Sequence, residues 1–189
     1  MTHSKNIRSS VAIILMVCML FVSSVGTTGS AKTSFKSYKA VIKYHKDNQT
    51  ASSCSYSYIK FKTKKGSVKA MSVVDVQGVY MTSTKLYLPV EGKIKLVNTF
   101  PGYITHVSKD MKSFLTYGYS GMGMGGYRYF KYNAKKDKFE QKGAVGYDTE
   151  SYLYPERETQ AKNKLLKKCK IKMSGFKKVT SSSVKIYGT

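Results

Sequence analysis

The sequence is poor in the residues from which catalytic and metal sites are usually built. Its 189 residues include three histidines, three cysteines, ten acids and no tryptophan. Histidine and cysteine do not occur at the close spacing of a zinc site, and there is no P-loop and no Gly-x-Ser-x-Gly sequence. We therefore expect a protein that is not an enzyme and that has no bound metal ion or cofactor.

Acidic residues are also few in relation to basic ones. Lys and Arg total 33 against 10 Asp and Glu, so the formal net charge is +23. An excess of this size attracts polyanions and makes their binding sensitive to salt. Nucleic acid is expected to bind only non-specifically. This charge is the strongest indication of function that the composition contains.

The first 31 residues have the three zones of a secretory signal peptide. Lys5 and Arg8 form a basic start, 11–22 is an unbroken apolar run, and small and polar residues follow up to Ala31. The apolar run is shorter than the about 20 residues that span a bilayer. Residues 1–31 are therefore interpreted as a signal peptide, with an uncleaved N-terminal anchor as the alternative.

The expected mature chain is a single β-rich domain, 32–189. Cleavage after Ala31 is the first expectation, and cleavage after Gly26 is the second. We expect this chain to be secreted, free in the extracellular space or associated with the cell wall, without a transmembrane segment. Its length suits one domain. The 16 Tyr and eight Phe favour sheet, because aromatic rings pack well on pleated surfaces.

Two cysteines, Cys54 and Cys169, lie in this mature chain. An even number of cysteines in an oxidising compartment favours a disulfide. On the chain-entropy model, a bridge that closes so long a loop would contribute about 4–5 kcal/mol. The pair is a candidate disulfide, and two separate buried thiols are the alternative.

Two segments have the apolar spacing of amphipathic helices. The first is 34–48, with Ser34 as its expected N-cap. The second opens at Pro155, a residue suited to the first turn of a helix. In this helix Leu165 and Cys169 lie one turn apart, so Cys169 is expected to face the core.

Between the helices the apolar period changes to two, which is typical of strands separated by turns. The expected strands are Tyr56–Lys62, Val68–Val76, Gly78–Thr82, Lys85–Leu88, Lys93–Asn98, Tyr103–Ser108, Ser113–Tyr119, Tyr127–Tyr132 and Lys138–Lys142. We expect a mainly β fold of the α+β type, in which a single twisted antiparallel sheet, a blade-like meander, is flanked by an N-terminal and a C-terminal helix. The tail from Ile171 would add a last strand.

Residues Ser120–Gly126 (SGMGMGG) contain the G-x-G-x-x-G pattern of dinucleotide-binding loops. That motif must follow a strand and open a helix, whereas here it precedes Tyr127–Tyr132, so a hairpin connection is the preferred interpretation. The strand interleaves tyrosines with Arg128 and Lys131. Such a strand could stack rings and hold phosphates, or its rings could be packed and its cations solvated.

Few residues could serve as a catalytic base. His106 lies in an expected strand, and Asp75 is the one acid within an apolar strand. An edge or bulge position would explain Asp75 without any chemistry. A hydrolase acting on envelope polymers, with Asp75 or His106 as its base, is the alternative function.

Several short patterns occur in a fixed order in the middle of the chain. Leu86–Val97 (LYLPVEGKIKLV) is followed by Gly102-Tyr103-Ile104, and Ser120–Tyr132 joins a glycine-rich hairpin to YRYFKY. In this order they resemble a module of small secreted proteins of Gram-positive gut clostridia (Lachnospiraceae-like) with FG-GAP/VCBS-like β-blades. The resemblance covers 56–132 and implies a binding or surface role without enzymatic activity.

The chain departs from that module where the blades carry an Asp-rich, calcium-binding loop. Lys62, Lys64 and Ala70 stand at the positions of the Asp, Asn and Glu ligands, while Gly66 keeps the turn. Calcium needs several oxygen ligands, and ammonium groups repel it. The resemblance therefore implies a degenerate, metal-free blade with a basic loop.

These observations together predict a secreted, strongly basic, non-enzymatic binding protein of the cell envelope or extracellular space. Its expected partners are anionic envelope polymers, such as teichoic acids, or anionic host glycans. The candidate polyanion-binding residues are Lys60, Lys62, Lys64, Lys65, Arg128 and Lys131. A basic surface kept only for solubility is the alternative, and no oligomeric state is predicted.

Overall fold

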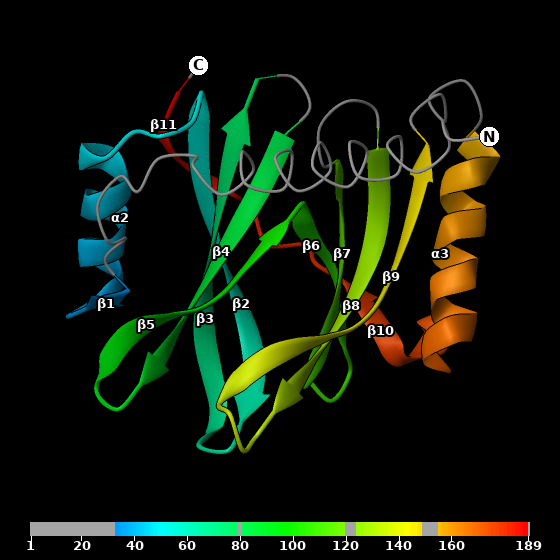
Figure 1. The fold of residues 1–189 in the computed structure, drawn as a ribbon. Coiled ribbons are helices and arrows are strands. Elements are labelled where there is room, and N and C mark those ends of the chain that lie inside the picture. Colours follow the sequence, from blue (N-terminus) through cyan, green and yellow to red (C-terminus); the bar gives the residue numbers. More distant parts are fainter. Residues whose placement is uncertain (1–32, 79–80, 120–123, 149–154, 189) are drawn as a thin grey trace, which may run out of the picture. The chain divides into compact units, whose positions relative to one another are not determined.

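The computed structural model describes residues 33–78, 81–119, 124–148 and 155–188. Most of them lie in antiparallel strands that form two sheets, and a helix packs against the outer face of each sheet (Figure 1). All belong to one compact unit, Thr33–Thr189. The expected signal peptide, residues 1–31, lies outside the described residues.

The first sheet has six strands in the order β1-β5-β4-β3-β2-β11. Its long strands are joined as consecutive hairpins, and the short strands β1 and β11 lie at its two edges. The strands are β1 (Ser34–Phe35), β2 (Ser53–Thr63), β3 (Gly66–Gln77), β4 (Met81–Val90), β5 (Lys93–Pro101) and β11 (Val184–Tyr187). Because β3 lies between β2 and β4, both of its backbone edges are hydrogen-bonded, and the side chains of Ala70–Val73 in its middle are buried.

The second sheet has five strands in the order β10-β6-β7-β8-β9. They are β6 (Tyr103–Ser108), β7 (Ser113–Tyr119), β8 (Met124–Asn133), β9 (Lys138–Asp148) and β10 (Phe176–Lys178). The C-terminal tail thus adds two strands rather than the one expected, with β10 in this sheet and β11 in the first. Between α3 and β10 it forms a short 3-10 helix, η2 (Met173–Gly175).

The two helices are α2 (Tyr38–Asp47) and α3 (Pro155–Cys169). The second begins at Pro155 as predicted. The first begins later than predicted, because Ser34 pairs with β5 as part of β1. Ser37 is the actual N-cap, and its hydroxyl accepts a hydrogen bond from the Ala40 N–H at 3.2 Å. Among the described residues no helix has the length and apolarity needed to cross a bilayer.

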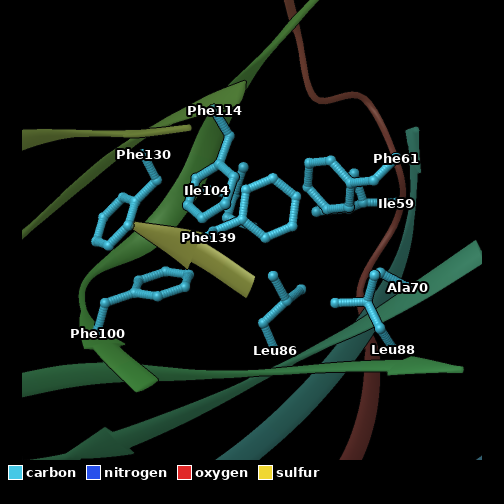
Figure 2. Close-up of a cluster of buried hydrophobic side chains, with 10 residues drawn as sticks. All are labelled: Ile59, Phe61, Ala70, Leu86, Leu88, Phe100, Ile104, Phe114, Phe130 and Phe139. Atoms are coloured by element: carbon cyan, nitrogen blue, oxygen red, sulfur yellow. The ribbon is translucent and has the colours of Figure 1, made fainter. Parts of the chain in front are cut away.

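The main core lies between the two sheets and is built largely from phenylalanine (Figure 2). The first sheet contributes Phe61 and Phe100, and the second contributes Phe114, Phe130 and Phe139. The centroid of the Phe114 ring lies 4.9 Å from that of Phe130, 5.0 Å from Phe139 and 5.4 Å from Phe100. These contacts hold the sheets face to face.

A tight corner between β5 and β6 carries the chain from the first sheet to the second. Gly102 at this corner has a φ of +79°. A Cβ atom there would meet the backbone of Tyr117 and Gly118 in β7. The corner therefore lies directly against β7, which only glycine permits.

The prediction of a mainly β fold flanked by two helices is confirmed. The prediction of a single sheet is wrong, because β5 and β6 are joined by the corner at Gly102 and do not pair with each other. Lys85–Leu88 and the end of Gly78–Thr82 belong to one strand, β4. Alternation of apolar residues indicates strands, but it does not indicate where a sheet ends.

Candidate polyanion-binding site

Four hairpin turns of the two sheets come together at one end of the fold. They are 64–65, 91–92, 109–112 and 134–137, which join β2–β3, β4–β5, β6–β7 and β8–β9. Figure 1 shows the β2–β3 and β8–β9 turns at its lower edge. We call these four turns and the strand residues beside them the basic end.

Hydrogen bonds tie these turns to one another across the two sheets. The Lys62 N–H donates to the Met111 carbonyl at 2.9 Å, and the Tyr132 N–H donates to the Lys112 carbonyl at 2.8 Å. The hydroxyl of Tyr132 accepts a hydrogen bond from the Lys64 N–H at 3.2 Å. Three of the turns are therefore linked through their backbones.

Exposed lysines occupy all of this end. They are Lys62, Lys64, Lys65, Lys93, Lys109, Lys112, Lys131, Lys135, Lys136 and Lys138. Of these, only Lys64 and Lys136 form an ion pair with a described residue. The remaining ammonium groups face solvent, so together they create a positive potential at this surface.

The acids of the basic end are held by local donors and remain ionised. The Ser108 hydroxyl donates to Asp110 at 2.5 Å and lowers its pKa. A hydrogen bond from Tyr132 and the nearby Lys64 likewise lower the pKa of Asp137. Glu91 is bound by Lys95 at 2.6 Å, which lowers its pKa. Each carboxylate is thus bound by a donor of its own turn or the adjoining strand. These few negative charges leave most of the lysine charge of the basic end uncompensated.

We expect the stability of the protein to fall in acid through these carboxylates. The pKa of both Asp110 and Asp137 is lower in the folded chain than in the unfolded chain. Their contribution is therefore complete above the unfolded value, about 3.9, and is lost as the pH falls through the folded value. Each contributes less than about 1 kcal/mol, because partly exposed pairs contribute little.

Urea unfolding at pH 6 and at pH 3 measures this loss. The Tyr132→Phe protein lacks the hydroxyl that donates to Asp137, so it should lose less stability between the two pH values than the wild type. An equal loss in the two proteins would contradict the assignment.

The structure brings four of the predicted binding residues together. Lys62, Lys64, Lys65 and Lys131 all belong to the basic end, and Lys60 is exposed on β2 just before it. Arg128 is separate from them. Its side chain is half-buried, burial lowers its pKa, and its Nη1 atom has no hydrogen-bond partner among the described residues.

Sequence reasoning missed the lysines of two further turns. Lys109 and Lys112 are the first and last residues of the β6–β7 turn, and Lys135 and Lys136 lie in the β8–β9 turn. A signal was present, since every second turn of an antiparallel meander lies at the same end of the strands. This signal could identify the lysines only once the packing of the two sheets was known, because that packing places the β2–β3 turn beside the other turns.

A cavity of about 730 Å³ opens between the sheets at another place. It is lined by strand residues of both sheets, by α3 and by the C-terminal tail, and His106 and Lys162 are on its wall. Glu158 also lines it and accepts a hydrogen bond from the Tyr127 hydroxyl at 2.6 Å. Of the two bases considered from the sequence, His106 is the one that faces a cavity.

Asp75 lies in a different environment from the one expected. It is in the central strand β3, in uninterrupted register with both β2 and β4, so the edge or bulge interpretation is wrong. The residue is 4% exposed, and its Oδ2 accepts a hydrogen bond from Lys85 Nζ at 2.6 Å. A polymer cannot reach a carboxylate at this depth.

His45 of α2 and Cys54 of β2 lie beside Asp75. His45 Nδ1 is 4.0 Å from Cys54 Sγ and 3.8 Å from Asp75 Oδ1. A catalytic nucleophile instead contacts one ring nitrogen while the carboxylate contacts the other. Burial raises the pKa of the Cys54 thiol, which opposes formation of the reactive thiolate. These three residues are therefore not arranged as a nucleophile with its base.

The predicted disulfide is wrong, because Cys54 and Cys169 are both free. Cys54 packs in a cluster with α2 on the outer face of the first sheet. Cys169 packs with α3 on the outer face of the second sheet. The phenylalanine core lies between these faces, so the two thiols belong to opposite sides of the fold.

Comparison of the chain with protein-family models, with curated proteins and with solved structures finds no match. The resemblance to FG-GAP/VCBS-like blades therefore stays a prediction.

Proposed function

We propose that this protein is a secreted, non-enzymatic binding protein of the cell envelope or extracellular space that holds anionic polymers at its basic end. The observation that supports this proposal is the convergence of exposed lysines from separate hairpin turns on one surface. Lysines 45 and more residues apart in sequence, such as Lys64 and Lys109, become neighbours on that surface only through the packing of the sheets.

A polymer suits this arrangement better than a small anion does. The ammonium groups lie on several turns and do not converge on one pocket, so each offers a single weak contact. Many such contacts along a chain of phosphate, sulfate or carboxylate groups add up, and their sum falls as salt rises. Teichoic acids and anionic host glycans have this repeated charge. Nucleic acid also has it, and would bind only non-specifically through its phosphates.

Rigid turns favour the same function. Residues with positive φ shape each of them: Gly66, Glu91, Met111 and Asp137. Three of these are not glycine, and the side chains of Glu91 and Asp137 are held by the hydrogen bonds described above. The lysines are thus presented from fixed backbones, which reduces the entropy lost when a polymer binds.

Two triple variants with equal net charge test the proposal. One replaces Lys65, Lys109 and Lys135 of the basic end by glutamine. The other replaces Lys164, Lys167 and Lys168, which are exposed on α3, by glutamine. Binding of each protein to purified wall teichoic acid is measured over a series of salt concentrations.

We expect the basic-end variant to bind about ten-fold more weakly than the wild type and to depend less on salt, because each lysine contributes a fraction of a kcal/mol. The α3 variant should stay within about two-fold of the wild type. Equal loss in both variants would show an effect of net charge alone and would contradict a site at the turns. Shortening of the polymer during incubation would instead favour the alternative hydrolase.

A further inference from the structure

Three side chains of the kinds that bind zinc meet in the interior beneath α2. His45 comes from α2, Cys54 from β2 and Asp75 from β3, and all three are buried. Their potential ligand atoms, one from each residue, all lie within 4.8 Å of one another. Three consecutive elements of the chain thus direct a nitrogen, a sulfur and an oxygen toward one point.

The spacing is close to that of a coordinated metal ion. Zinc at its usual bond lengths to nitrogen, sulfur and oxygen brings tetrahedral ligand atoms to about 3.4–3.6 Å of each other. His45 Nδ1 lies 4.0 Å from Cys54 Sγ and 3.8 Å from Asp75 Oδ1. Both distances from His45 are within about half an ångström of the zinc-bound values. The Cys54 and Asp75 ligand atoms lie within 4.8 Å of each other, so binding would draw the thiol and the carboxylate together by side-chain adjustment.

The groups around these ligands are those that support a metal site. The other ring nitrogen of His45, Nε2, is 3.0 Å from the Tyr87 hydroxyl, which fixes the ring with Nδ1 toward Cys54 and Asp75. Lys85 Nζ binds Asp75 Oδ2 at 2.6 Å. This leaves Asp75 Oδ1, which is buried and has no hydrogen-bond partner of normal geometry among the described residues. The Cys54 thiol is close enough to Asp75 for a weak hydrogen bond to contribute, after burial, to the raised pKa of the thiol.

An unpartnered carboxylate oxygen in the interior is costly unless something binds it. A cation at the centre of the three ligands would satisfy Asp75 Oδ1. Thiolate and imidazole ligands suit zinc and do not suit the hard cations calcium and magnesium. A zinc ion bound to one thiolate and one carboxylate carries no net charge, so the neighbouring Lys85 is compatible with it.

We propose that His45, Cys54 and Asp75 form a zinc-binding site that fixes α2 to the first sheet. The Cys54 thiol gives up its proton to solvent as the metal binds. The site is on the outer face of the first sheet and does not depend on polymer binding at the basic end.

Metal binding to the whole reduced protein tests this proposal. Zinc affinity is measured by competition with a chromophoric chelator, and cobalt is added as a spectroscopic probe, because a thiolate ligand gives cobalt a charge-transfer band in the near ultraviolet. Cys54→Ser removes the proposed thiolate. Cys169→Ser is the matched control, since Cys169 is the other described cysteine and belongs to the cluster under α3.

We expect one zinc ion per chain and a cobalt–thiolate band in the wild type and in Cys169→Ser. Cys54→Ser should lack the band and bind zinc at least about 100-fold more weakly, more than the 10- to 100-fold that loss of a supporting residue costs. Absence of the band in the folded wild type, or its persistence in Cys54→Ser, would overturn the proposal.

A second variant keeps the test valid if Cys54→Ser does not fold. Asp75→Asn retains the cysteine and the side-chain shape, and we expect it to weaken zinc binding at least about ten-fold. Zinc should also raise the thermal midpoint of the wild type and of Cys169→Ser, and raise it less in Asp75→Asn. An equal rise in all three proteins would place the metal elsewhere and contradict the site.

Discussion

Replacement of Gly102 by alanine should destabilise the protein by about 3–5 kcal/mol, because it adds overpacking to backbone strain. Gly102 has a φ of +79°, which an L-residue adopts only with strain. A Cβ atom at this position would lie 2.6 Å from the carbonyl carbon of Tyr117 and 2.7 Å from the Cα of Gly118. Both obstacles are backbone atoms of β7, so no side-chain rotation relieves the contact.

Gly92→Ala separates the two contributions. Gly92 has nearly the same φ, +75°, but a Cβ atom there would meet nothing within 4 Å. Its replacement should cost only the conformational strain, about 1 kcal/mol. Urea unfolding followed by far-ultraviolet circular dichroism measures both proteins. Equal losses would show that the corner at Gly102 is not packed against β7 as the structure has it.

Replacement of Phe114 by alanine should cost about 3–5 kcal/mol, as for other buried phenylalanines. The side chain is fully buried, and its ring contacts the rings of Phe61, Phe100, Phe130 and Phe139 from both sheets. Its removal leaves a cavity at the centre of the core. Because strands on both sides of that cavity are tied into sheets, the surroundings can close it only in part.

Met81→Ala is the control for the core substitution. Met81 is also a large apolar residue in a strand, but it is 46% exposed. Its truncation should change the free energy of unfolding by no more than about 0.5 kcal/mol. A similar loss in the Phe114 and Met81 proteins would mean that the sheets do not pack through the phenylalanine cluster.

Local patterns in the sequence predicted much of the secondary structure. β6 and β7 begin and end where alternation places them, and α3 begins at Pro155. The start of α2 was missed because Phe35 fits a helical stripe as well as a strand. Only the pairing of β1 with β5 shows that Phe35 lies in an edge strand.

The buried polar residues show more clearly what local sequence patterns cannot predict. In the sequence, Asp75 is an acid within an apolar strand, and Cys54 is a candidate disulfide partner of Cys169. In the structure both side chains lie close to His45, so residues from two strands and a helix form one cluster. Nothing in the spacing of these three residues resembles a known ligand pattern, because the ligands come from elements that tertiary packing brings together.

The sequence by itself determined the strong positive charge, the period-two segments that become strands, and the glycines and turn residues between them. These properties are local, since they depend on side-chain type and on neighbours a few residues away. The tertiary structure alone decided that the strands divide into two sheets at Gly102, that lysines of separate turns share one end, and that the two cysteines lie on opposite faces. The reason is physical: strand pairing and core packing join residues far apart in the chain, and their energies depend on contacts that a linear pattern does not contain.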